Sequence, residues 1–103
     1  MRGNRTDSNQ TELVKYFRAW GCSVLIIADL KNCCDIIIAK HGRTIAVEIK
    51  DGKKPKSARK LTDGERIFEE NWSGAWRLVE STKDADNVIS ELNSTLAIPL
   101  RWD

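Results

Sequence analysis

Two runs rich in isoleucine and valine, residues 34–40 and 43–50, are separated only by His41 and Gly42. Such runs favour β-strands, and a two-residue connection favours a tight hairpin whose central residues have positive φ. Glycine adopts that φ freely and histidine tolerates it. The sequence therefore predicts an antiparallel hairpin with a fixed register.

This register decides which side chains share a face. With Lys40 opposite Arg43, Asp35 lies opposite Glu48 in a non-hydrogen-bonded pair, with Cα atoms ~4.5 Å apart. Alternation places Asp35, Glu48 and Lys50 together on one face. The other face is entirely apolar and must be core, with Ile36, Ile38, Ile45, Val47 and Ile49.

Periodicity and capping residues place the other elements. They predict a helix over 7–20, a strand over 23–30, a basic loop over 51–60, a helix from Thr62 to before Gly74, a strand over 75–80, and a helix from Ser81 or Thr82 to about Asn93. Thr62 and Glu65 have the spacing of a capping box. The order α-β-β-β-α-β-α predicts an α/β domain with a mixed sheet of about four strands: an antiparallel meander, then a helical crossover.

Length and composition fit one domain over residues 1–103, with a core over about 8–93 and a tail over 94–103. Hydrophobic residues make up 41% and charged residues 31%, a balance typical of globular proteins. No apolar run is long enough for a membrane span. The first ten residues are polar, unlike a signal peptide, so we expect a cytosolic protein without membrane partners.

Three cysteines, two of them adjacent, argue against a disulfide framework. A zinc site from Cys22, Cys33, Cys34 and His41 would match no usual ligand spacing. The sequence favours small buried thiols instead.

Asp35 and Glu48 carry the candidate chemistry. Like charges directly opposite each other cost stability, and a hard divalent cation would offset that cost. Lys50 alone could also neutralise the pair, which would make a simple surface ion-pair cluster. The chemical interpretation is phosphodiester hydrolysis, in which Mg²⁺ or Mn²⁺ activates a water and polarises the phosphate while Lys50 orients that water or neutralises developing charge.

A basic segment follows Lys50 directly, and Asp51 alone opposes its charge. Its further cations are Lys53, Lys54, Lys56, Arg59 and Lys60. Such a segment is either a solvated loop or a surface that contacts DNA phosphates.

These motifs resemble a known family. Asp35 within Cys34-Asp35-Ile36-Ile37-Ile38, followed by Val47-Glu48-Ile49-Lys50-Asp51-Gly52, resembles the PD-(D/E)xK nuclease superfamily. The resemblance covers about residues 8–90 and is sharpest to its VRR-NUC branch, particularly small stand-alone phage forms. Cys34 stands where the motif has proline, and Lys31-Asn32 stands where a glycine-rich loop is common.

The resemblance implies a restriction-endonuclease-like core and a Mg²⁺- or Mn²⁺-dependent endonuclease. Its implied substrate is DNA, including branched or Holliday-junction DNA, and its implied assembly is a homodimer. The implied metal ligands are Asp35, Glu48, the Ile49 carbonyl and Glu12, the acidic residue expected on the first helix. Arg66 stands where the family tends to carry glutamine, and arginine can bind phosphate bidentately.

Two other interpretations remain. The chain could be a nucleic-acid-binding module of the same fold without activity, or a structural or regulatory interaction protein. The apolar tail over 96–102 fits docking on a partner and packing on its own core equally well.

Overall fold

The computed structural model describes residues 8–102, so the predicted helix start at residue 7 lies outside the described residues. The elements are α1 (Ser8–Ala19), β1 (Ser23–Ile26), β2 (Ile36–Lys40), β3 (Arg43–Ile49), the short 3₁₀ helix η2 (Lys56–Arg59), α2 (Asp63–Asn71), β4 (Ala75–Val79) and α3 (Thr82–Asn93). The predicted element order is confirmed, with η2 added inside the basic loop. Among these helices, none is both long enough and apolar enough to cross a bilayer.

The sheet is mixed, with strand order β1-β2-β3-β4. β1, β2 and β3 form the predicted antiparallel meander, and β4 joins β3 in parallel after the α2 crossover. Lys40 pairs with Arg43, and the register continues to the pair of Ile36 and Val47. His41 and Gly42 have φ of 57° and 75°, as the tight turn requires.

All four strands are shorter than predicted, β3 and β4 by one residue at the C-terminal end and β1 and β2 by more. β1 ends at Ile26 instead of residue 30, because the chain turns at once, with the Leu30 N–H donating to the Ile27 carbonyl. β2 begins at Ile36 instead of residue 34, because the Asp35 N–H donates to the Val47 carbonyl, which Ile36 already faces. The regular ladder thus ends at Ile36, so Asp35, the preceding residue in the sequence, lies outside it.

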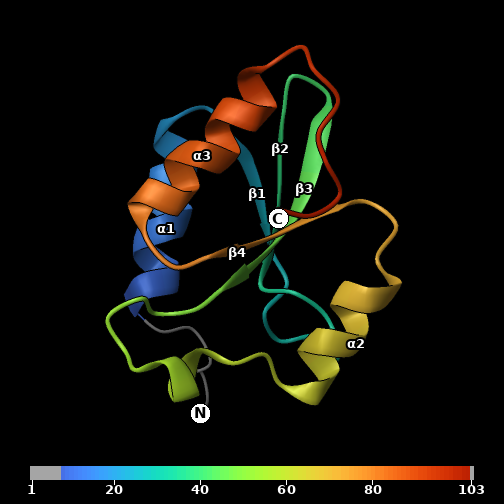
Figure 1. Cartoon of the computed structure of the whole chain (residues 1–103). Helices are drawn as coiled ribbons and strands as arrows, with labels where there is room; N and C mark the ends of the chain where they lie inside the picture. The colour runs from blue at the N-terminus through green and yellow to red at the C-terminus, as the bar shows by residue number, and fades with distance from the viewer. Residues whose placement is uncertain (1–7, 103) are drawn as a thin grey trace.

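One face of the sheet carries the core. Figure 1 shows α1 and α3 together on one side of the sheet and α2 on the other. The predicted core residues of β2 and β3 are all buried against α1 and α3, with Leu13 and Phe17 of α1 fully buried. α2 has no buried residue. All three cysteines are free thiols, and Cys22 and Cys34 are buried.

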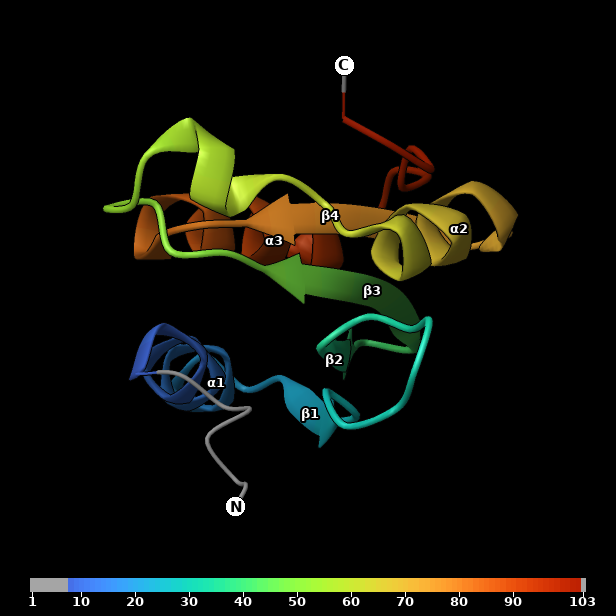
Figure 2. The ribbon, with the colours of Figure 1, turned by 90° about the horizontal axis from the view of Figure 1, so that it is seen from below.

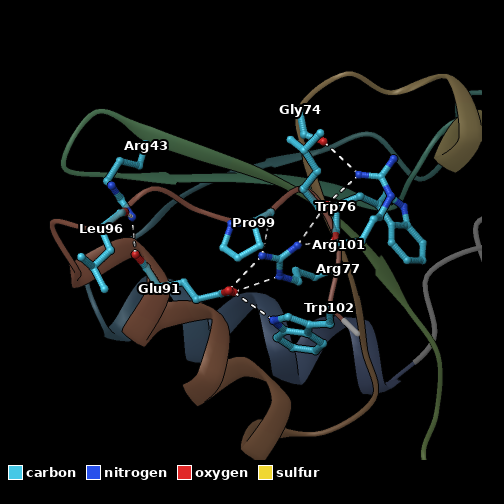
Figure 3. A network of polar contacts seen from close by, with 10 residues as sticks. Arg43, Gly74, Trp76, Arg77, Glu91, Leu96, Pro99, Arg101 and Trp102 are labelled. Carbon is cyan, nitrogen blue, oxygen red and sulfur yellow. Dashed lines mark hydrogen bonds and ion pairs between the residues drawn. The ribbon is translucent and has the colours of Figure 1, made fainter.

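The C-terminal tail packs on its own domain through its main chain, while its side chains Leu96 and Leu100 remain 74% and 55% exposed. Arg77 of β4 is 1% exposed and forms a bidentate pair with Glu91 of α3, at 2.9 Å for each hydrogen bond (Figure 3). Its guanidinium also donates to the carbonyls of Pro99 and Leu100 in the tail. The Trp76 N–H donates to the Leu100 carbonyl at 3.0 Å, so the tail lies along the outer edge of β4.

Glu91→Ala should lower the free energy of unfolding by about 3 kcal/mol, because it leaves the buried Arg77 guanidinium without its counter-charge. Asp63→Ala is the matched control, since it also removes the partner of an arginine, Arg66, but at a site where Asp63 is 92% exposed. It should cost only a small fraction of that value. Urea denaturation of both variants measures the difference, and equal losses would show that the Arg77 pair is energetically ordinary.

Candidate active site

Asp35 is fixed by hydrogen bonds to the segments on both sides of it. Its main-chain N–H donates to the Val47 carbonyl at 3.1 Å, and its carbonyl accepts from the Ile27 N–H at 2.9 Å. Its side-chain Oδ2 accepts from the Ile49 N–H at 2.7 Å. Asp35 therefore contacts β3 on either side of Glu48, and its carboxyl group is also in hydrogen-bonding contact with that of Glu48.

The predicted ladder pair of Asp35 with Glu48 is not formed, because the regular pairing ends at Ile36 and Val47 and the Asp35 N–H donates to the Val47 carbonyl. The two carboxyl groups still lie close together. Glu48 is 2% exposed, and its carboxyl group is in hydrogen-bonding contact with those of Asp35 and Glu65. A polar cavity of about 220 Å³ opens over these groups. Ile49 also lines it, and because the Ile49 side chain is in the core, its main chain faces the cavity.

Lys50 lies at the same cavity but pairs with a residue that sequence reasoning did not assign to the site. Its Nζ donates to Glu65 Oε1 at 2.8 Å. Glu65 comes from the first turn of α2, where it also completes the predicted capping box with Thr62. The capping pattern thus located Glu65 in the sequence but indicated only a role at the helix end. On the α1 side, Asn9 donates to the Lys50 carbonyl at 2.8 Å.

Three carboxyl groups around one lysine have different proton affinities. Burial, followed by the neighbouring Asp35, raises the pKa of Glu48 to about 10. Burial also raises the pKa of Asp35, in part offset by hydrogen bonds from its neighbours. Burial alone would raise the pKa of Glu65, but hydrogen bonds from Lys50 and the Thr62 main chain outweigh it and lower that pKa. At neutral pH the metal-free site therefore holds a proton on Glu48.

The α1 residue at this cavity is Gln10, not Glu12. Gln10 is 3% exposed and lines the cavity together with the three carboxylates. Glu12 is exposed and lines a neighbouring cavity with Asp51 and Lys53. The structure thus brings together Asp35, Glu48, the Ile49 main chain and Lys50, and leaves Glu12 apart.

The basic segment divides into engaged and available cations. Figure 2 shows it arching away from the end of β3 before the chain enters α2. Arg59 is held by Glu80 at 3.0 Å and by the Lys54 carbonyl at 2.8 Å. Arg66 pairs with Asp63 at 2.8 Å. The exposed cations are Lys53, Lys54, Lys56 and Lys60, of which Lys54 lines the carboxylate cavity.

The donor chemistry suits a hard cation, although the site is not preassembled. Within residues 8–102, no three His, Cys, Asp or Glu side chains are arranged so that they could already hold a metal ion. The residues that line the cavity have carboxylate oxygens and, at Ile49, a main-chain carbonyl, which are the ligands that Mg²⁺ and Mn²⁺ prefer. Mg²⁺ needs few protein ligands because it keeps waters and takes substrate oxygens. Asp35, Glu48 and the Ile49 carbonyl fit that requirement.

No family model, curated protein or solved structure matches this chain.

Without metal, the stability of the protein should fall as pH rises from about 5 to 9. The folded-state pKa of Glu48, about 10, lies above the ordinary value of 4.5, so its contribution is complete below that ordinary value and is lost as pH approaches 10. Melting temperatures in EDTA measure this slope. Glu48→Gln should flatten it, because the amide stays neutral, whereas Glu70→Gln at an exposed position should keep it. A steep slope in Glu48→Gln would place its origin elsewhere.

Proposed function

We propose that this protein is a metal-dependent DNA nuclease, as its resemblance to the VRR-NUC branch of the PD-(D/E)xK superfamily implies. The observation that carries the proposal is one cavity that gathers a buried carboxylate, a half-buried carboxylate and a lysine from the adjoining ends of β2 and β3. Asp35, Glu48 and Lys50 all line it. Burial of Glu48 beside another acid is costly unless a proton or a cation offsets it, and groups maintained at such a cost are typical of functional sites.

Each residue has a defined part in phosphodiester hydrolysis. Asp35 and Glu48, with the Ile49 carbonyl, would hold Mg²⁺ or Mn²⁺. The bound cation would supply Lewis acidity, which makes a water more acidic and the phosphorus more electrophilic. Lys50 would face the phosphate and stabilise charge as the water oxygen bonds to phosphorus and the sugar oxygen leaves. Its ammonium is 2.8 Å from Glu65, at the wall of this cavity.

The substrate is assigned from charge. Lys54 stands at the cavity, and three further exposed lysines follow the same chain segment, Lys53, Lys56 and Lys60. Such a group neutralises a phosphate backbone without reading base sequence. Branched or Holliday-junction DNA and a homodimer follow from the family resemblance and belong to the same proposal. A cytosolic location is consistent with the three free thiols, because a reducing compartment keeps cysteines from forming disulfides.

Asp35→Asn should abolish cleavage, because it removes an anionic ligand while the amide oxygen can still accept from the Ile49 N–H. The assay is incubation of the purified protein with linear, nicked, flapped and four-way-junction DNA, with Mn²⁺ or with EDTA. Asp86→Asn is the matched control, since Asp86 is on α3 and contacts Tyr16 rather than this cavity. Wild-type cleavage by Asp35→Asn would refute the site. Metal-independent binding without cleavage by the wild type would favour an inactive binding module.

Replacing Lys53, Lys54 and Lys56 with alanine should weaken DNA binding and flatten its salt dependence. Each lost phosphate contact should reduce the log–log salt slope by about 0.9 on duplex DNA. Arg59→Ala is the comparison, because Arg59 is already engaged by Glu80, so it should alter thermal stability more than the salt slope. An unchanged slope in the triple variant would show that the loop is only solvated.

A further inference from the structure

The ammonium of Lys50 has its ion pair outside the predicted ligand pair. Its Nζ is 2.8 Å from Glu65 Oε1, and the two side chains are 15% and 22% exposed. A lysine carries a compact charge on a flexible stem, so its position depends on what holds the charged end. Glu65 is that group here.

Glu65 is itself held in place by the start of α2. The oxygen that accepts from Lys50 also accepts from the Thr62 N–H at 2.8 Å. In return, the Glu65 N–H donates to Thr62 Oγ1 at 3.2 Å. Rotation of the Glu65 carboxylate would break the capping box, so the helix start restrains the ammonium of a neighbouring strand.

Capping alone does not account for this arrangement. A capping glutamate needs only the main-chain N–H of its N-cap residue. Glu65 also contacts Glu48, which is in β3, and Lys50, which directly follows β3. The contact with Lys50 has a further consequence. It keeps the ammonium paired at the cavity wall, so the carboxylates of Asp35 and Glu48 are not taken up by a lysine ion pair.

We propose that Glu65 is a positioning residue for Lys50 in the hydrolysis proposed above, on which this inference rests. It sets the place of the ammonium beside the reacting phosphate and leaves Asp35 and Glu48 to the cation. Glu65 belongs to neither the Asp35 motif nor the Glu-x-Lys motif, and it reaches the site only because α2 packs its first turn there.

The test compares Glu65→Gln with Thr62→Ala by three measurements: the single-turnover cleavage rate in Mn²⁺, DNA affinity in Ca²⁺, and melting temperature. Glutamine still completes a capping box, so Glu65→Gln should keep the melting temperature and the affinity near wild type. Its cleavage rate should fall about 10- to 100-fold, the scale typical of groups that orient a catalytic residue. Thr62→Ala removes the cap but keeps the carboxylate, so it should lower the melting temperature more and the rate less.

A double-mutant cycle with Lys50→Ala isolates the route of the effect. If Glu65 acts through Lys50, Glu65→Gln should have little further effect on the rate once Lys50 is alanine. The inference would be overturned if the rate losses of Glu65→Gln and Lys50→Ala multiplied in the double variant. It would also be overturned by a wild-type or faster rate in Glu65→Gln, or by an equal rate loss in Thr62→Ala. These outcomes presuppose metal-dependent cleavage by the wild type. If the wild type does not cleave, the proposed function fails first and this inference falls with it.

Discussion

The hydrogen bonds of Asp35 attach the segment before β2 to β3 and so fix the carboxylates of the site on the sheet. Its main chain bridges Ile27 and Val47, and its carboxylate receives the Ile49 N–H. A carboxylate held by a main-chain donor cannot swing to solvent without leaving that donor unsatisfied. Its second oxygen is therefore fixed beside Glu48. The cavity lies beside this attachment, whereas the place of Lys50 depends in addition on Glu65.

Such a site requires a stable support, which the opposite face of the sheet provides. The apolar side chains of α1 and α3 cover that face, while α2 on the other face buries none of its residues completely. Stability and polar function are thus separated between the two faces. β3 belongs to both, because Val47 is part of the core and its neighbour Glu48 is part of the site. Because side chains alternate along a strand, a substitution in β3 affects the core or the site according to the face on which the residue lies.

Much of the fold follows from local rules. The two-residue turn determined the hairpin register, and the capping box located the start of α2. The departure at Asp35 could not be read from alternation, because it depends on a main-chain bond to Val47. Glu12 was expected from the family resemblance, whereas the α1 residue at the cavity is Gln10. Two helix positions differ by about 200° in direction, and Gln10, three residues before the buried Leu13, shares its face. The role of Glu65 required the packing of α2, which no local pattern contains.

The tail over residues 94–102 also determines how this sheet can meet other chains. A sheet offers unpaired main-chain groups at its two outer strands, here β1 and β4. At β4 the Trp76 N–H already donates to the Leu100 carbonyl, and the Arg77 guanidinium donates to the same carbonyl. A foreign strand adding there would have to displace the tail and strip carbonyl acceptors from a buried guanidinium. At β1 the protection is lighter, because the Arg18 guanidinium donates to the Val24 carbonyl at 3.3 Å while Leu25 remains 61% exposed. A strand added at β1 would displace this one side-chain donor instead of the whole tail, so intermolecular strand pairing costs less at β1 than at β4.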